Sequence, residues 1–373
     1  MPNVSSQTQR AQLGPLPLSS GARLAAVEVA YEQYGALSSH GDNAVLVCHA
    51  LTGSARAAGD EGWWDPLIGP GAAFDTNRYA VFCSNILGSC YGTTGPTSED
   101  PERGLLYGGD FPRISVGDMV QVQRALMAQI GVKSLVTVAG GSLGGLQVLE
   151  WAAQAPDMVR SIAPIGAGLS HSAWNIAFNE TARQAIRQDP NWHGGDYLRH
   201  GVAPEAGLAL ARMFAIISYR SAESFEDRFG RRHDSPREAT PRNYEVESYL
   251  HYQGRKLVER FDANCYMRIT EAMDDFDVGE GRGGASAALK AFRGPALVLG
   301  IDSDVLYPPW QQHLVANALR ENGNPVTYGE IQSLHGHDAF LMEWGQMADH
   351  LAAFMEGLGT GSGGNCRHGS PTG

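Results

Sequence analysis

Short apolar segments alternate with helical segments along most of this chain of 373 residues, and this alternation restricts its fold more than any other feature. Five segments have the length and apolar character of buried strands and a sixth is weaker: 43–50, 78–85, 134–141, 159–168, 295–302 and 325–333. Between them lie amphipathic patterns such as 116–131, in which apolar residues recur at helical spacing. Strands that alternate with helices form a mostly parallel sheet with helices on both faces. The sequence therefore predicts an α/β protein.

The alternation stops in the middle of the chain. From 169 to 288 the helical periodicity continues, with polar, loop-like interruptions and no clear strand. We therefore predict an α/β core, made of residues 1–168 and 289–356, that carries a helical cap (lid) as an insertion at 169–288. The segment 357–373 is rich in glycine and serine, and its low complexity predicts a disordered tail.

Composition excludes several classes of function. The formal net charge of −12 disfavours broad binding to nucleic acid or to an anionic membrane. No apolar run reaches the roughly 20 residues of a membrane-spanning helix, and the first residues lack the apolar core of a secretory signal. The five cysteines show no paired spacing and are expected to be reduced thiols. We expect a soluble, cytoplasmic protein.

One serine stands among glycines between a predicted strand and a predicted helix. The pentapeptide Gly140-Gly141-Ser142-Leu143-Gly144 fits G-x-S-x-G, the turn that lifts a nucleophilic hydroxyl above the carboxyl edge of a sheet. The alternative is a glycine-rich turn with a solvated serine, but few chance matches fall on a strand–helix junction. We therefore expect Ser142 to be a nucleophile.

A serine nucleophile needs a general base and a carboxylate that orients this base. In the α/β-hydrolase order both follow the serine, the acid first and the histidine second. Asp302 and Asp304 follow the fifth predicted strand, and His335 and His337 follow the sixth. We favour Asp304, which lies deeper in its loop, and His337, which follows a glycine and precedes a helix. A metal site at the two histidines is the alternative, although no third ligand is evident.

An acyl-transfer site also needs two backbone amides that stabilise the oxyanion. The amide after the nucleophile belongs to Leu143, and the second is expected from the loop 48–53 after the first strand. An ordinary strand-to-helix turn is the alternative for that loop.

Several stretches together match a known family: HALTG, GWWDPLIGPG, YGTTGP, GGSLGG, ISYRS, RFDANCYM and GHDAFL. On these stretches the chain resembles the homoserine O-acetyltransferases, enzymes of the α/β-hydrolase fold in methionine biosynthesis, from about residue 13 to about residue 356. The resemblance implies Ser142 as nucleophile, His337 as base and Asp304 as its orienting acid. It also implies that the amides of Leu51 and Leu143 form the oxyanion hole.

The resemblance further implies a site for an amino acid. Arg212 and Tyr219 would hold its carboxylate, and Asp338 its ammonium group. The spacing agrees, because residues seven apart lie about two turns along one face of a helix. The alternative is that Arg212 pairs with a surface acid and that Tyr219 packs within the cap.

The reaction implied by the resemblance is a ping-pong transfer of acetyl from acetyl-CoA to the hydroxyl of L-homoserine. It needs no metal and no cofactor besides acetyl-CoA as co-substrate, and the family suggests a homodimer. A succinyl donor would need a cation beside its free carboxylate, whereas the loop 304–309 contains apolar Leu306 and no arginine. Acetyl is therefore favoured over succinyl.

Several functions besides this one stay open on the sequence. Serine in place of homoserine differs by one methylene, which a pocket discriminates by only about 1–3 kcal/mol. The fold would equally suit a succinyl-transferring relative, a serine hydrolase with the same triad or a ligand-binding protein without activity.

Overall fold

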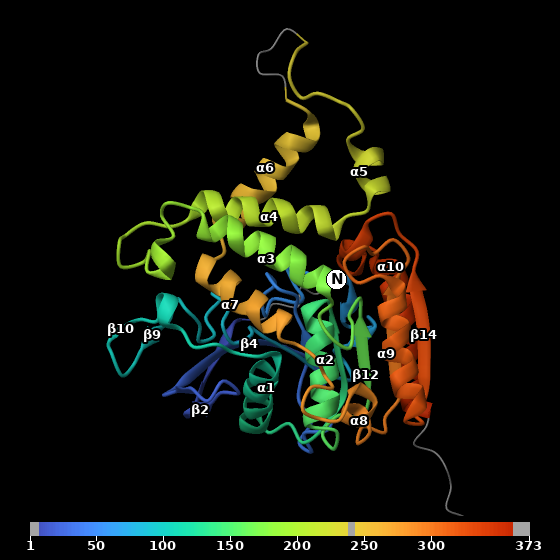
Figure 1. The fold of residues 1–373 in the computed structure, drawn as a ribbon. Helices are drawn as coiled ribbons and strands as arrows, with labels where there is room; N and C mark the ends of the chain where they lie inside the picture. The colour runs from blue at the N-terminus through green and yellow to red at the C-terminus, as the bar shows by residue number, and fades with distance from the viewer. Residues whose placement is uncertain (1–6, 238–242, 361–373) are drawn as a thin grey trace, which may run out of the picture.

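A sheet of eight strands forms the centre of the computed structural model, which describes residues 7–237 and 243–360 (Figure 1). The strands lie in the order β1-β4-β8-β5-β11-β12-β13-β14. Neighbouring strands from β8 to β14 are parallel, whereas β4 is antiparallel to both of its neighbours. Their bounds are β1 (Gln9–Leu13), β4 (Val27–Tyr34), β5 (Ala44–Cys48), β8 (Ala80–Ser84), β11 (Leu135–Gly141), β12 (Ile162–Ile165), β13 (Ala296–Ile301) and β14 (Val326–Ile331).

Each of the six predicted strands is present, and the predicted fold class is confirmed. Sequence reasoning did not identify β1 and β4, because charged and polar side chains interrupt their apolar pattern. Three short two-stranded sheets lie outside the main sheet. They pair β2 (Leu16–Pro17) with β3 (Arg23–Leu24), β6 (Ile68–Gly69) with β7 (Phe74–Asp75), and β9 (Glu99–Asp100) with β10 (Leu105–Leu106).

Helices cover both faces of the sheet, and each face has its own apolar core. On one face pack α1 (Val116–Ile130), α2 (Leu143–Gln154), α8 (Ala285–Leu289) and α9 (Pro309–Glu321). The other face packs against α10 (Trp344–Thr360) and residues 55–74. Successive strand residues enter opposite cores, as Leu46 and Val47 of β5 do.

Local signals explain where α1 begins and ends. Its N-cap Ser115 accepts a hydrogen bond from the Asp118 amide, while the Asp118 carboxylate accepts one from the Ser115 amide. This capping box satisfies amides that the helix leaves free. The helix ends at Gly131, whose φ of 95° lies in the left-handed region.

The helical segment between β12 and β13 covers the carboxyl ends of the parallel strands (Figure 1). It contains α3 (Ala173–Arg187), α4 (Glu205–Tyr219), α5 (Ala222–Arg228), α6 (Glu245–Val258) and α7 (Ala263–Asp274). Figure 1 shows α3 and α4 lying across the carboxyl ends of the parallel strands, with α5 and α6 projecting away from the sheet. α8 begins at Ala285, so the end of the predicted cap, up to residue 288, belongs to a helix that packs on the core.

The predicted disordered tail begins too early. Helix α10 continues to Thr360, so residues 357–360 are helical. Their composition is rich in glycine, but Leu358 packs against the apolar core under α10 and extends the helix. Residues 361–373 of that prediction lie outside the described part of the chain.

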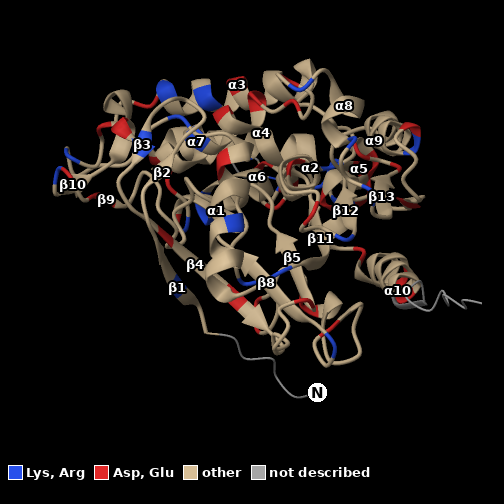
Figure 2. Cartoon of the chain, turned by 90° about the horizontal axis from the view of Figure 1, so that it is seen from below, with Lys and Arg blue, Asp and Glu red and all other residues tan. Residues whose placement is uncertain are grey.

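Charged side chains lie mainly outside the sheet. Lys, Arg, Asp and Glu are found on the helices and loops around it, and the two signs are mixed (Figure 2). Cys48, Cys83, Cys90 and Cys265 are free thiols, and Cys366 lies outside the described residues. Within residues 7–237 and 243–360, no helix has the length and apolarity needed to cross a membrane.

Candidate active site

Ser142 occupies a strained turn at the carboxyl edge of the sheet. It follows β11 directly, it is the N-cap of α2, and its φ of 58° and ψ of −126° are unusual for a residue with a side chain. Such a conformation costs of order 1–3 kcal/mol and persists only where the surroundings impose it. Here the Ser142 amide donates to the Ile165 carbonyl at 3.0 Å, and its carbonyl accepts from Leu146 at 3.1 Å.

The glycines around Ser142 are required by the neighbouring strand. A Cβ at Gly144 would lie 2.1 Å from the carbonyl oxygen of Cys48 in β5. A Cβ at Gly140 would lie 2.7 Å from the same oxygen, because Gly140 pairs with Cys48 in the sheet. Both distances are far below van der Waals contact, so only glycine allows this approach of β5, β11 and α2.

Asp304 and His337 form a hydrogen-bonded pair. The His337 Nδ1 lies 2.7 Å from Asp304 Oδ2, and their side chains are 3% and 0% exposed. The second oxygen of Asp304 accepts the amides of Leu306 and Tyr307, each at 2.8 Å. These bonds satisfy a buried carboxylate and hold it toward the imidazole.

The other members of the two sequence pairs lie elsewhere. Asp302 accepts a hydrogen bond from the Ser333 amide at 2.9 Å. The His335 amide donates to the Ser333 hydroxyl at 3.0 Å. The residues favoured from the sequence, Asp304 and His337, are therefore the ones that the fold pairs.

The environment of His337 suits a general base. Burial acts to lower its pKa, but the charge and hydrogen bond of Asp304 prevail, and the pKa is raised above its ordinary value. Its Nε2 is buried and has no hydrogen-bond partner among the described residues. This nitrogen is therefore available to accept a proton.

The amides of Leu51 and Leu143 are both available as hydrogen-bond donors. Leu143 is the first residue of α2, where helix geometry leaves its N–H free, and Leu51 is buried in the turn after β5. Within the described part of the chain, neither amide donates to another protein group. The free N–H of a helix terminus stabilises negative charge.

His49 and Gln147 hold these two turns together, and sequence reasoning did not identify either role. The side-chain Nε2 of Gln147 donates to the carbonyls of His49, at 3.3 Å, and Leu143, at 3.2 Å. The His49 ring bonds the Ala50 carbonyl and accepts the Ile86 amide. Burial lowers its pKa to about 4, so His49 stays neutral. The only sequence feature that pointed to His49 was its position within the HALTG stretch.

Arg212, Tyr219 and Asp338 converge near the imidazole. The Arg212 guanidinium lies 5.5 Å from the centre of the Tyr219 ring, and that ring lies 5.9 Å from the His337 ring. Burial raises the pKa of Asp338, and the Arg212 charge opposes this shift, which indicates that the two groups interact. Neither forms an ion pair with another residue of the described chain. A cation and an anion that form no direct ion pair thus interact near the His337 imidazole.

A small enclosed cavity of about 20 Å³ adjoins Ser142. Leu51, Ser142 and Leu306 line it from the core side, and α3, α4 and α7 supply most of the remaining wall. A cavity of this size holds about one water molecule. The helical segment therefore shields the nucleophile from bulk solvent.

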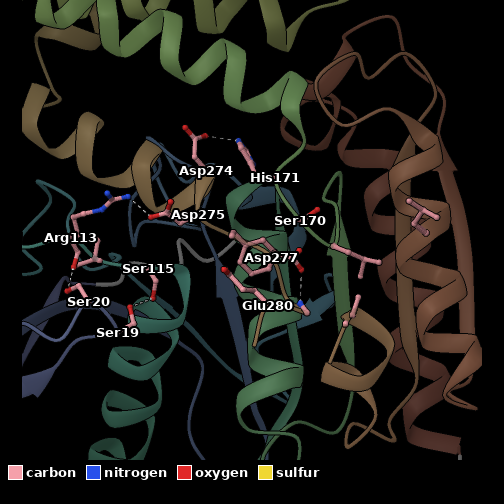
Figure 3. Close-up of a pocket in the computed structure, with 17 residues that line it drawn as sticks. Ser19, Ser20, Arg113, Ser115, Ser170, His171, Asp274, Asp275, Asp277 and Glu280 are labelled. Carbon is pink, nitrogen blue, oxygen red and sulfur yellow. Dashed lines mark hydrogen bonds and ion pairs between the residues drawn. The ribbon is translucent and has the colours of Figure 1, made fainter. Parts of the chain in front are cut away.

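A larger pocket of about 1090 Å³ lies nearby, between the start of α1 and the end of α7 (Figure 3). Its lining includes Asp274, Asp275, Asp277 and Glu280 but not Ser142. His171 lines both this pocket and the cavity beside Ser142. No group of three or more His, Cys, Asp or Glu side chains among the described residues is arranged to hold a metal ion.

Comparisons with known proteins agree with this geometry. The family model described as alpha/beta hydrolase fold matches residues 43–341. A homoserine O-acetyltransferase of Carboxydothermus hydrogenoformans is 46% identical over 94% of this chain and 95% of its own length. One from Moorella thermoacetica is 49% identical over 92% of this chain and 94% of its length. The chain belongs to the homoserine O-acetyltransferase family.

Solved structures include members of the same family and other enzymes of this fold. The homoserine O-acetyltransferase of Bacillus anthracis is 28% identical, with a TM-score of 0.88 over 94% of this chain and 97% of that one. Esterase E22 is 26% identical, with a TM-score of 0.87 over 94% of this chain and all of the other. The backbone fold alone therefore does not separate acyl transfer from ester hydrolysis.

Proposed function

We propose that this protein is a homoserine O-acetyltransferase, which transfers acetyl from acetyl-CoA to the hydroxyl of L-homoserine in methionine biosynthesis in the cytoplasm. The identity of 46–49% to homoserine O-acetyltransferases over nearly the whole chain carries this conclusion. The strained turn at Ser142 and the buried Asp304–His337 pair support the acyl-transfer chemistry.

In the first half-reaction, His337 Nε2 takes the Ser142 proton while the Ser142 oxygen attacks the thioester carbonyl. The amides of Leu51 and Leu143 stabilise the oxyanion. The tetrahedral intermediate collapses as the carbon–sulfur bond breaks, and CoA leaves with the proton from His337. The acetyl group then remains on Ser142 as an ester.

In the second half-reaction, the hydroxyl of L-homoserine loses its proton to His337 and attacks the acetyl-serine ester. Arg212 and Tyr219 bind the amino-acid carboxylate, and Asp338 binds the ammonium group. The intermediate collapses to O-acetylhomoserine, and Ser142 recovers its proton. This route uses no metal and no resident cofactor.

The acyl pocket favours acetyl over succinyl. Leu306 lines the cavity beside Ser142, where the second carboxylate of a succinyl group would need a cation. His171 lines the same cavity, but burial and the nearby Arg183 charge lower its pKa to about 3 and keep it uncharged. An acetyl methyl group needs no such charge.

A serine hydrolase is the second candidate, because esterase E22 matches the fold as well as a family member does. The two functions differ in whether water or an amino-acid hydroxyl accepts the acetyl group. Arg212, Tyr219 and Asp338 support the transferase, because a hydrolase has no use for a zwitterion site.

We also propose that the protein is a homodimer. Leu210 and Ile217 on α4 and Tyr252 on α6 are 42%, 46% and 50% exposed, and α4 packs against α6. Exposed apolar side chains on neighbouring helices are candidates for an interface. Light scattering coupled to size exclusion should give twice the chain mass.

The decisive experiment for the activity measures CoA thiol release from acetyl-CoA with L-homoserine, L-serine or no acceptor, beside Ser142→Ala. Release that requires homoserine and disappears in Ser142→Ala is the expected result. A stronger response to L-serine would change the acceptor but keep the transfer chemistry. Release that is equal with and without acceptor would identify a hydrolase and contradict the roles of Arg212 and Asp338.

A further inference from the structure

Tyr307 contacts both members of the acid–base pair, although neither the proposed mechanism nor the sequence gives it a role. Its ring stacks on the His337 imidazole, with centroids 5.3 Å apart and planes inclined by 28°. Its amide donates to Asp304 at 2.8 Å, and its side chain is fully buried. Tyr307 is therefore packed against the Asp304–His337 pair.

The hydroxyl of Tyr307 connects this pair to the cap. Tyr307 Oη lies 3.0 Å from His171 Nδ1, while His171 Nε2 lies 3.1 Å from Asn179 Nδ2. The same Asn179 amide nitrogen donates to Asp274 Oδ1 at 2.7 Å, so it is a donor toward His171 as well. His171 Nε2 thus accepts, and its Nδ1 proton is donated to the Tyr307 oxygen.

His171 is itself fixed in place. Its amide donates to the Phe276 carbonyl at 2.9 Å, which joins the first residues of the cap to the segment after α7. Its imidazole is 2% exposed and packs edge-on against the Tyr307 ring at 5.8 Å. Figure 3 shows His171 beside Asp274 at the edge of the larger pocket. The Tyr307 hydroxyl therefore accepts its hydrogen bond from His171, an imidazole that is uncharged and fixed in place.

We propose that Tyr307 and His171 are positioning residues that hold the His337 ring in its reactive orientation and couple that orientation to the cap. Asp304 binds only Nδ1 of His337, so packing sets the rotation of the imidazole about this bond. The rings of Tyr219, Phe340 and Tyr307 all pack on the imidazole, and Tyr307 alone of these three also binds Asp304. The His171 hydrogen bond in turn restricts Tyr307. The inference rests on the proposed function only in taking Ser142 and His337 as nucleophile and base.

The test measures how fast a fluorophosphonate labels Ser142, a reaction that needs the His337 base but neither proposed substrate. Tyr307→Phe keeps the ring and removes the hydroxyl. One lost hydrogen bond predicts roughly threefold to tenfold slower labelling and an equal fall in kcat. The KM values should stay unchanged, because Tyr307 does not line the cavity beside Ser142.

Two further variants separate positioning from stability. His171→Asn keeps an N–H near the Nδ1 position and should retain most of the labelling rate, whereas His171→Leu should match Tyr307→Phe. Tyr34→Phe is the control, because it removes another buried tyrosine hydroxyl, one that donates to Glu32 and accepts the amides of Ala57 and Ala58. These partners are distant from Asp304 and His337 in sequence. The thermal midpoint of every variant shows whether it folds.

The outcomes distinguish the two proposals. Labelling at the wild-type rate in Tyr307→Phe and His171→Leu would overturn the inference while leaving the transferase assignment intact. Slower labelling in both variants, with Tyr34→Phe unaffected, supports the inference even if acetyl transfer to homoserine is not observed. An equal fall in the labelling rate of Tyr34→Phe would also overturn the inference, because the loss of any buried hydroxyl would then slow the labelling.

Discussion

At the scale of single residues, the proton balance of His337 predicts how the activity depends on pH. The base must be neutral to accept the Ser142 proton, and Asp304 raises its pKa. The rate kcat/KM should therefore fall as the pH drops, with a midpoint above the ordinary histidine value of about 6.5. Rates measured from pH 5 to pH 9 give this midpoint.

Asp304→Asn tests the cause of that shift. Without the carboxylate charge, burial dominates, so the midpoint should move to lower pH. The rate should also fall by about 10³-fold to 10⁴-fold, because an amide does not hold the reactive tautomer of the imidazole. Asp302→Asn is the matched control and should leave both the midpoint and the rate nearly unchanged. An unaltered midpoint in Asp304→Asn would contradict the assigned origin of the shift.

Asp338 predicts a separate effect on the acceptor. Asp338→Asn removes the anion proposed to bind the ammonium group, a charged hydrogen bond worth about 1.5–3 kcal/mol. The KM for L-homoserine should rise roughly tenfold to a hundredfold, while the acetylation step changes little at alkaline pH. Because burial raises the Asp338 pKa, the wild-type KM should also rise as the pH falls. An unchanged KM would place the ammonium group elsewhere.

Sequence and structure differ most in what individual residues contact. The ends of predicted strands located Ser142, Asp304 and His337, because parallel strands place their carboxyl ends along one edge. The Tyr307–His171 contact joins residues 136 positions apart and has no motif, so no pattern in the chain predicts it. The choice of Asp304 over Asp302, by contrast, followed from its position deeper in the loop, where the amides of Leu306 and Tyr307 hold its carboxylate.

At the scale of elements, the strongly apolar parallel strands were predictable and the antiparallel edge was not. Buried parallel strands form continuous apolar runs, whereas β4 includes Glu28 and Glu32 and is antiparallel to its neighbours β1 and β8. Its amides at Glu28 and Ala30 donate to the hydroxyls of Thr94 and Thr93, a contact with a distant loop that the sequence does not reveal.

The junction of β11 and α2 carries a prediction about stability. Ser142 has a φ of 58° that glycine adopts without strain. Ser142→Gly should therefore be more stable than Ser142→Ala by about 1 kcal/mol, since relief of strain exceeds the added chain entropy. Both variants lack the nucleophile, so they differ only by one Cβ. Urea unfolding midpoints decide the order, and a less stable glycine variant would show that this turn stores no strain.

At the scale of the whole molecule, the core supplies the reacting groups and the helical segment closes the site over them. Besides the Tyr307–His171 contact, hydrogen bonds join these parts near the active site: Trp174 with the Val305 carbonyl, Asn175 with the Leu306 carbonyl, and Arg260 with Thr52. The first two reach the loop of Asp304, and the third reaches the loop of Leu51. The helical segment thus contacts both the loop that holds Asp304 and the loop that presents the Leu51 amide.

Arg260 allows this connection to be tested, because it lies between α6 and α7 while its partners belong to the core. Its guanidinium donates to the Thr52 carbonyl at 2.8 Å and to the Tyr91 hydroxyl at 2.6 Å. Arg260→Met should loosen the loop that presents the Leu51 amide and lower kcat/KM for acetyl-CoA roughly threefold to tenfold, the effect of one or two exposed hydrogen bonds.

Arg199→Met is the matched control for Arg260→Met. Arg199 is also an exposed arginine of the helical segment, but its partners are Asp110 and Asp196, away from the Leu51 loop. The control should leave kcat/KM unchanged, because exposed ion pairs contribute little. Acetylation rates from rapid-mixing measurements with acetyl-CoA compare the two variants at the same pH. Equal rates would mean that the core presents its oxyanion donors without help from the cap, and the helical segment would then act only by excluding water.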